Sequence, residues 1–262
     1  MFPATIEVSP VDYLEQIGSV FACFDAQDSG NVSYGVQFGT NRFFVKTAGD
    51  PDRPDLVLNW AERVAMLRNA ADLAASVTHP VMPTLHAVID SPGGPLLVYA
   101  WRDGDLLGRG GNPDAHARFR SLPTSEIVAA LNAIYDLHAQ LDAAGWVEGD
   151  FYDGALMYDF DRRQLTVMDL DTYRRGPYRN DMGRMFGSSR FMAPEQFSLG
   201  APIDSRTTAY VMARTALVFL SDSTLDRDAF RGSDQQYAVV QEATTTRFPS
   251  FTDFYAAWRT AT

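Results

Sequence analysis

The sequence predicts an α+β protein in which a small antiparallel five-stranded sheet precedes a larger, mainly helical part. Short runs of β-branched and aromatic residues, separated by turn residues, occupy the chain up to residue 101. Beyond that residue, long stretches repeat apolar residues at three- and four-residue spacing, which is typical of amphipathic helices. We therefore predict two domains, residues 1–101 and residues 102–262.

The composition is that of a globular protein without a membrane-spanning segment. The 262 residues are 46% hydrophobic, and the most apolar run, residues 210–220, is too short to cross a bilayer. The first residues lack the basic and apolar regions of an export signal, so we expect a cytoplasmic protein. A net charge of −11 argues against a broad nucleic-acid-binding surface, since that binding depends on neutralising phosphates.

Several residues are predicted to lie in the core. The chain has one cysteine, Cys23, which excludes an internal disulfide and suits a reducing compartment. Its apolar neighbours predict that Cys23 is a small buried residue. Five phenylalanines of the second domain are also expected in the core: Phe119, Phe186, Phe191, Phe197 and Phe219.

The first domain contains five predicted strands and one long helix. The strands are residues 21–24, 34–39, 42–49, 81–89 and 95–101, and the helix is residues 56–77. The loop of residues 25–33 joins the first two strands, and Gly30 and Gly35 would let backbone N–H groups approach an anion. A stretch rich in Gly, Ser and Asn is also simply a turn.

Lys46 and Glu62 each have two interpretations. Lys46 ends the third strand, where a lysine often just points into water, and Glu62 lies in the first half of the helix. Glu62 either holds Lys46 in place or belongs to a solvated helix face. Spacing alone does not separate these interpretations.

The second domain begins with a helix at residues 125–143 and continues with a hairpin and two further helices, residues 206–220 and 251–260. The hairpin strands, residues 155–158 and 164–168, flank the polar turn of residues 159–163. Folding this hairpin brings Asp150, just before the first strand, beside Asp169 and Asp171, just after the second.

Three carboxylates at one end of a hairpin repel one another. A divalent metal would offset this repulsion, since Mg²⁺ binds carboxylate oxygens together with substrate phosphates. The alternative is that these residues are solvated loop acids, which are common on protein surfaces. The order of other segments along the chain favours the metal.

These segments extend over nearly the whole chain, from about residue 21 to residue 258. They are the glycine-bearing hairpin, Phe44-Val-Lys46, Glu62, Leu97-Val-Tyr-Ala-Trp101, Gly149-Asp150, Met168-Asp-Leu-Asp171, Met192-Ala-Pro-Glu195, Asp204 and Arg247. In this order they resemble the protein kinase fold, specifically the bacterial eukaryotic-like Ser/Thr kinases. The resemblance implies a two-lobed fold, in which residues 1–101 form the nucleotide-binding lobe and residues 102–262 the catalytic lobe.

The resemblance also implies ATP and Mg²⁺ or Mn²⁺ as cofactors, with a role for each segment. Lys46, held by Glu62, would pair the α- and β-phosphates. Asp150 would orient the acceptor hydroxyl and accept its proton, while Asp169 and Asp171 would bind the metal. The implied nucleotide-binding residues are Ser29, Gly30, Asn31, Val32, Ser33, Lys46, Tyr99, Ala100 and Arg102.

Scaffold roles follow from the same resemblance. Glu195 is expected to pair with Arg247, and Asp204 is expected to hydrogen-bond the backbone of the catalytic loop. Tyr99 would sit at the back of the adenine pocket, while the backbone of Ala100 and Arg102 would hydrogen-bond the base.

The chain departs from the family pattern at the catalytic loop. Glu148-Gly149 stands where His-Arg is usual, and Ala155 stands where an asparagine normally binds the second metal. Asp171 replaces the glycine of Asp-Phe-Gly. We hypothesise that Asp171 or Asp153 supplies the missing oxygen ligand.

The sequence thus predicts an ATP-dependent phosphotransferase of protein kinase type, which transfers the γ-phosphate to a Ser/Thr or other hydroxyl of a protein or small molecule. The alternative is a pseudokinase that binds nucleotide or protein partners without transferring phosphate. Neither nucleic acid nor a membrane is expected as a partner. Arg174, Arg175 and Arg179 would receive an anionic substrate group or offset nearby acids.

Overall fold

The computed structural model describes residues 2–26, 29–53, 56–108 and 111–262. It is a mixed α+β structure with a five-stranded antiparallel sheet and several helices, which confirms the predicted class and sheet. The chain divides into two compact units, Met1–Asp103 and Gly104–Thr262, whereas the sequence analysis set the division after Trp101. Each unit has hydrophobic clusters of its own.

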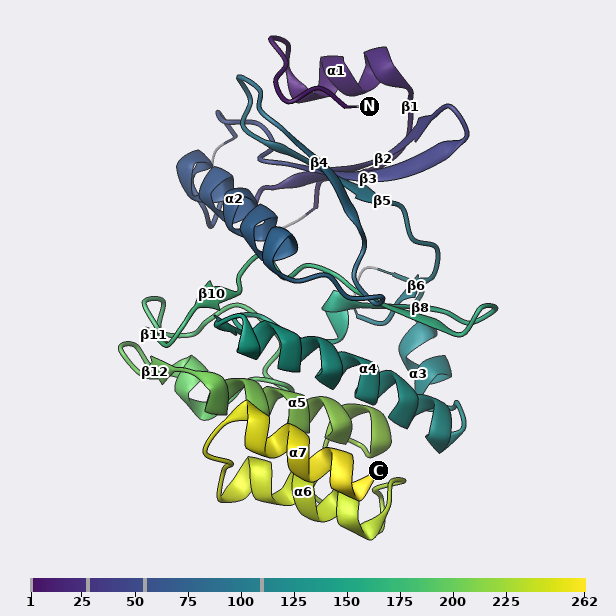
Figure 1. Cartoon of the computed structure of the whole chain (residues 1–262), viewed down its shortest axis with the longest axis vertical. Helices are drawn as coiled ribbons and strands as arrows, with labels where there is room; N and C mark the ends of the chain where they lie inside the picture. Colours follow the sequence, from purple (N-terminus) through teal and green to yellow (C-terminus); the bar gives the residue numbers. More distant parts are fainter. Residues whose placement is uncertain (1, 27–28, 54–55, 109–110) are drawn as a thin grey trace. The chain divides into compact units, whose positions relative to one another are not determined.

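The sheet of the first unit has the strand order β1-β2-β3-β5-β4 (Figure 1). Its strands are β1 (Ser19–Phe24), β2 (Val32–Phe38), β3 (Asn41–Thr47), β4 (Leu85–Ile89) and β5 (Leu96–Ala100). The register places Lys46 of β3 opposite Ser33 of β2 and Leu97 of β5. Residues that face each other across antiparallel strands lie on the same side, so these three side chains share one face.

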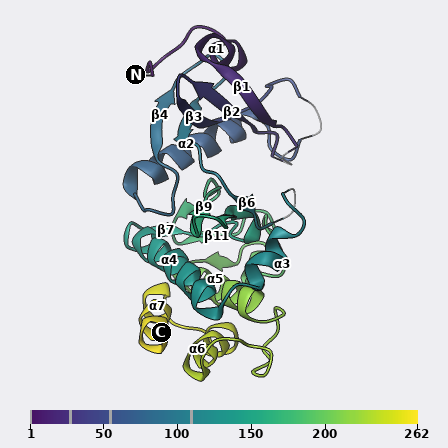
Figure 2. The ribbon, with the colours of Figure 1, turned by 90° about the vertical axis from the view of Figure 1, so that its right-hand side faces the viewer.

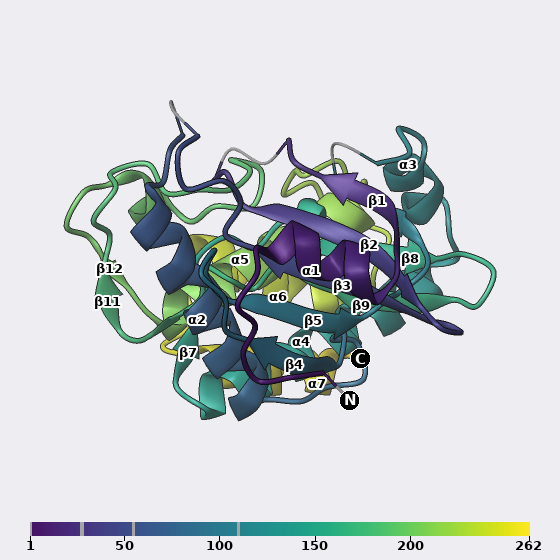
Figure 3. The same cartoon turned by 90° about the horizontal axis from the view of Figure 1, so that it is seen from above.

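A helix covers each face of this sheet (Figure 2). On one face α1 (Pro10–Ile17) packs Leu14 into a cluster with Val98 of β5, and it lies over the strands in Figure 3. On the other face α2 (Trp60–Ser76) packs Leu67 against Leu97. Because side chains alternate along a strand, Lys46 lies on the face covered by α2.

The sequence analysis did not predict α1. Its start carries the expected signals, because Ser9 accepts a hydrogen bond from the N–H of Asp12 at 3.2 Å and Pro10 stands at the first helical position. At eight residues the helix has too few turns for its apolar spacing to be distinctive.

The second unit is mainly helical. Its helices are α3 (Ala115–Arg120), α4 (Thr124–Ala143), α5 (Ser205–Leu220), α6 (Asp234–Thr245) and α7 (Phe251–Ala261). Tyr135 of α4 lies edge-on to Phe254 and Trp258 of α7, with ring centroids 5.3 and 5.1 Å apart. Within the described residues, no helix is both long and apolar enough to cross a membrane.

Short paired strands connect the loop segments of the second unit. The predicted hairpin is present as β8 (Leu156–Asp159) and β9 (Gln164–Val167), and β6 (Asp105–Leu106) adds a third strand beside β8. Two further ribbons pair β7 (Trp146–Val147) with β10 (Arg174–Arg175) and β11 (Tyr178–Arg179) with β12 (Pro202–Ile203). Single turns of 3₁₀ helix occur at η1 (Asp153–Ala155) and η2 (Pro194–Phe197).

Two burial predictions are wrong. Cys23 is exposed, because β1 is an edge strand whose side chains are largely uncovered. Phe197 is 43% exposed, because it ends a single 3₁₀ turn at the surface. Phe119, Phe191 and Phe219 are buried as predicted, whereas Phe186 is half-buried.

Candidate functional site

The β8–β9 hairpin brings two of the predicted aspartates together. Leu156 pairs with Val167, so the segment before β8 and the segment after β9 leave the hairpin at the same end. Burial, followed by the charge of Asp169, raises the pKa of Asp150 to about 7. The Oδ1 atom of Asp150 is buried and has no hydrogen-bond partner within the described residues. Asp150 and Asp169 are therefore electrostatic neighbours.

Gly187 packs closely against this oxygen. A Cβ atom at residue 187 would stand 2.7 Å from Oδ1 of Asp150, and the φ angle of Gly187 is +113°. Residues other than glycine rarely adopt this backbone conformation, so both the close approach and the φ angle require glycine here.

The acids after β9 differ from each other in exposure. Asp169 is exposed and has a φ angle of +62°, an uncommon conformation that costs of order 1 kcal/mol and is frequent at functional sites. Asp171 is only 8% exposed. In the part of the chain that the structure describes, no group of three or more His, Cys, Asp or Glu side chains is placed to hold a metal ion. The donor set fits Mg²⁺ only as an ion held by one or two carboxylates and completed by substrate phosphates.

Asp153 is already paired with one cation and lies near an imidazole. Its Oδ2 atom lies 2.5 Å from the guanidinium of Arg190 and 3.5 Å from Nε2 of His116, and its side chain is nearly fully buried. The Ala155 side chain, at the end of the same 3₁₀ turn, is also buried. Asp153 is thus poorly placed to supply the missing oxygen ligand.

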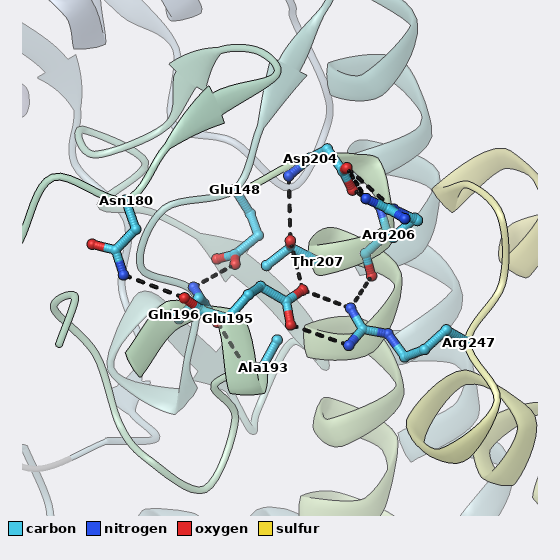
Figure 4. A network of polar contacts seen from close by, with 9 residues as sticks. All are labelled: Glu148, Asn180, Ala193, Glu195, Gln196, Asp204, Arg206, Thr207 and Arg247. Carbon is cyan, nitrogen blue, oxygen red and sulfur yellow. Dashed lines mark hydrogen bonds and ion pairs between the residues drawn. The ribbon is translucent and has the colours of Figure 1, made fainter. Parts of the chain in front are cut away.

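Glu148 is a buried acid that the sequence analysis treated only as a departure from the family. The Glu148 residue is fully buried, and burial raises its pKa to about 8. Its carboxylate accepts a hydrogen bond from the Gln196 side chain at 2.8 Å (Figure 4). It also accepts one from the N–H of Phe151 at 3.2 Å. The sequence signal that could have indicated this burial is the position of Glu148 directly after the apolar pair Trp146-Val147.

The expected pair between Glu195 and Arg247 is confirmed (Figure 4). The guanidinium donates to both carboxylate oxygens, at 2.6 and 3.1 Å. Thr207 donates to the same carboxylate at 2.8 Å from the first turn of α5. This network joins η2, α5 and the loop before α7.

Asp204 does not take the expected role. Its carboxylate caps α5, accepting the N–H of Arg206 at 2.9 Å, and it pairs with the guanidinium of Arg206 at 2.6 Å. Thr208 reaches the catalytic loop instead, because its hydroxyl accepts the N–H of Glu148 at 3.4 Å. An aspartate at a helix start satisfies the free N–H groups there. Asp204 therefore caps α5 in place of the expected hydrogen bond to the catalytic loop.

In the first unit, Lys46 lies in a buried polar environment. It is 6% exposed, and Ser33, directly opposite on the same face, is 0% exposed. Asn31, just before β2, is 2% exposed and donates to the carbonyl of Thr47 at 3.1 Å. The Oδ1 atom of Asn31 and the Oγ atom of Ser33 have no hydrogen-bond partner among the described residues. Two unpaired buried polar atoms are costly unless a ligand or water completes them.

Glu62 caps α2 rather than reaching inward. It is exposed, its carboxylate accepts the N–H of Asn59 at 2.8 Å, and the Asn59 side chain accepts the N–H of Glu62 at 3.0 Å. This capping box satisfies two free N–H groups of the helix, which explains why the solvated helix face is the interpretation observed.

Arg63, which the sequence analysis did not single out, occupies the interior. It is 1% exposed, and its guanidinium donates to the carbonyls of Gly30, Ala48 and Asp50 at 3.1, 2.5 and 2.9 Å. A guanidinium presents several donors in a fixed fork, so one side chain holds three loop carbonyls.

The glycines of the first hairpin are packed against side chains. A Cβ at Gly30 would lie 2.2 Å from Leu56, and a Cβ at Gly35 would lie 2.6 Å from the ring of Phe21 and 2.9 Å from that of Trp101. The expected anion-binding loop is therefore covered at both glycines. Residues 27–28 of that loop lie outside the described residues.

Tyr99, Ala100 and Arg102, which the resemblance implied for nucleotide binding, lie at the end of β5 or just after it. Tyr99 packs in the cluster under α2, and Arg102 donates to the carbonyl of Met82 at 3.5 Å. The N–H of Ala100 donates to the carbonyl of Thr84 at 2.8 Å, so it is not available to a base. Ser29 and Val32 lie at the N-terminal end of β2, beside Gly30.

Comparison with models of known protein families and with curated proteins finds no match to this chain.

Proposed function

We propose that this chain is a cytoplasmic, ATP-dependent phosphotransferase of protein kinase type, which transfers the γ-phosphate to a hydroxyl acceptor. The first unit would be its nucleotide-binding lobe and the second its catalytic lobe. The observation that carries the proposal is the buried carboxylate of Asp150, which keeps one oxygen without a hydrogen-bond partner in the described chain and has Asp169 as its charged neighbour.

The environment of Asp150 suits a general base. A base works best when its pKa lies near the operating pH, and burial raises the pKa of Asp150 to about 7. Gly187 lies so close to Oδ1 of Asp150 that any larger side chain would clash with this oxygen. In the proposed step the acceptor O–H proton passes to Asp150 while the acceptor oxygen bonds to the γ-phosphorus, and ADP leaves.

Asp169 would hold Mg²⁺ or Mn²⁺, with Asp171 as its partner. When bound, the metal supplies positive charge that offsets the phosphate oxygens. The exposed position of Asp169 and its repulsion of Asp150 support this role, because a bound cation would offset that repulsion.

Lys46 supports the ATP part of the proposal. Its buried side chain shares a face with Ser33, whose hydroxyl has no hydrogen-bond partner among the described residues and could donate to a phosphate oxygen. The unpaired Oδ1 atom of Asn31 only accepts, so water could complete it. The hydroxyl of Ser33 donates, so it suits an anionic oxygen directly.

A second candidate, a pseudokinase, is favoured by the covered glycine hairpin. The rings of Phe21 and Trp101 occupy the space at Gly35, and the N–H of Ala100 is already bonded. Together with Ala155, these contacts would leave a scaffold that binds partners without transferring phosphate.

Thermal-shift titration with ATP and ADP, with and without Mg²⁺ or Mn²⁺, tests the proposal together with a radiolabelled autophosphorylation assay. We expect binding that needs Lys46, and transfer that is lost in Asp150→Asn while nucleotide binding remains. Binding without transfer would establish the pseudokinase. Neither binding nor transfer would leave only a scaffold.

A further inference from the structure

A strip of arginines borders Asp150 in the second unit. Between residues 174 and 190 the chain carries five arginines and one acid, Asp181, although its overall net charge is −11. We call these residues the arginine strip: Arg174, Arg175, Arg179, Arg184 and Arg190. A local excess of positive charge on an acidic protein indicates where an anionic group would be attracted.

Two members of the strip are neutralised within the chain. Arg174 pairs with Asp181 at 3.0 Å, and Arg190 pairs with the buried Asp153 at 2.5 Å. These two ion pairs hold the segment in place.

The other three arginines pair with no carboxylate among the residues that the structure describes. Arg175 donates to the carbonyl of Ala144, Arg179 donates to the carbonyl of Gly200 at 2.8 Å, and Arg184 donates to that of Gly187 at 3.0 Å. A carbonyl orients a guanidinium without cancelling its charge. All three side chains are exposed, so their charges remain available to a partner.

Arg184 links the strip to the proposed base. Its anchor, the carbonyl of Gly187, belongs to the residue that packs closely against Oδ1 of Asp150. The charge of Arg184 acts on Asp150, where it opposes the rise in pKa caused by burial and Asp169. An anionic group held by Arg184 would thus lie close to the acceptor hydroxyl.

Exposed apolar side chains adjoin the same arginines. Phe197 is 43% exposed and lies 6.0 Å from the Arg184 guanidinium, measured to its ring centroid. Leu199, next to the Gly200 that anchors Arg179, is 72% exposed. A partner that covers this surface needs apolar groups as well as negative charge.

We propose that the acceptor is an acidic peptide segment, whose carboxylates bind Arg179 and Arg184 and whose apolar residues cover Phe197 and Leu199. This inference rests on the proposed function for the role of Asp150, but peptide binding itself requires no nucleotide. A peptide fits better than a long polyanion, because a chain of net charge −11 repels an extended polyanion beyond the strip.

Fluorescence anisotropy without nucleotide tests the proposal. The probes are a labelled serine peptide flanked by Asp, Glu and Leu, a matched peptide with Asn and Gln in place of the acids, and an oligonucleotide of equal charge. We expect the acidic peptide to bind about tenfold more tightly than the neutral one, and high salt to weaken it. The variants Arg179→Gln and Arg184→Gln should each lower its affinity about threefold or more.

Arg231→Gln is the matched control, because Arg231 is also exposed and also donates to carbonyls, those of Arg120 and Leu122. The Arg231→Gln variant should bind the acidic peptide with the same affinity as the wild type. Equal binding of acidic and neutral peptides, or no effect of either strip variant, would overturn the inference. Tighter binding of the oligonucleotide, lost in the same variants, would also overturn it in favour of a nucleic-acid site.

Failure of this inference and failure of the proposed function give different results. Selective peptide binding without phosphate transfer refutes the phosphotransferase and leaves the peptide site standing. Transfer to neutral and acidic peptides at equal rates supports the phosphotransferase and refutes the acidic-peptide site.

Discussion

The carbonyl oxygen of Thr172 lies where a side chain at Gly149 would begin: a Cβ there would stand 2.2 Å from it. The departure from His-Arg at this position is therefore built into the packing of two neighbouring loops. An arginine cannot be added at residue 149 without moving the segment that follows Asp171.

Gly149→Ala and Gly149→Arg should both destabilise the protein, by about 3 kcal/mol or more, because backbone has to move to relieve the overlap. Urea unfolding measures this loss. Gly183→Ala is the control, since nothing lies within 4 Å of its Cβ position and only its φ of +80° adds strain, about 1 kcal/mol. Equal losses at both positions would show that the Thr172 contact is not the cause.

Glu148 should make stability depend on pH. Its folded pKa of about 8 lies above the unfolded value near 4.5, so the folded state holds the proton more tightly between these pH values. The free energy of unfolding should fall as pH rises through this window, by on the order of 4 kcal/mol from this group. Glu148→Gln should remove that part of the slope in urea unfolding from pH 5 to pH 8, whatever constant loss its altered hydrogen bonds add.

Arg63→Met should destabilise the first unit by about 3 kcal/mol or more, because two buried hydrogen bonds and one partly buried hydrogen bond to carbonyls are lost. Arg68→Met, on the same helix, is the matched control. Arg68 pairs with Asp90 at the surface, where both side chains are about half exposed, and such pairs contribute about 1 kcal/mol or less. Similar losses in the two variants, measured by thermal unfolding, would contradict the assignment of Arg63.

Glu195 and Arg247 should show strong coupling. A double-mutant cycle with Glu195→Gln and Arg247→Met is expected to give an interaction energy of about 1–3 kcal/mol, since both groups are partly buried and joined by two hydrogen bonds. The cycle is measured by urea unfolding. A value near zero would mean that the pair adds nothing beyond its separate contacts.

Asp171→Ala should weaken Mg²⁺-nucleotide binding about tenfold, while binding of nucleotide without metal stays unchanged. Asp153→Asn is the comparison, because Asp153 is engaged by Arg190 and His116. It should lower stability and leave metal-dependent binding near the wild-type level. Calorimetric titration with and without Mg²⁺ would refute the role of Asp171 if its loss changed neither affinity.

The strands, the β8–β9 hairpin and the Glu195–Arg247 pair could be predicted because each follows from a pattern within one segment or from the order of segments. The contacts that each side chain makes could not be predicted. Glu62 and Asp204 both lie near helix starts, and both carboxylates accept hydrogen bonds there as caps. Arg63 looked like any surface arginine, since burial depends on carbonyls brought together from distant segments.

The hydrogen bonds from Arg63 to backbone carbonyl oxygens have an evolutionary consequence. Because its three hydrogen bonds go to backbone carbonyls, substitutions at those loop positions would leave these acceptors in place while the arginine stays the same. Methods that detect contacts from paired substitutions would overlook these hydrogen bonds, although they join two backbone segments, one before β2 and one after β3.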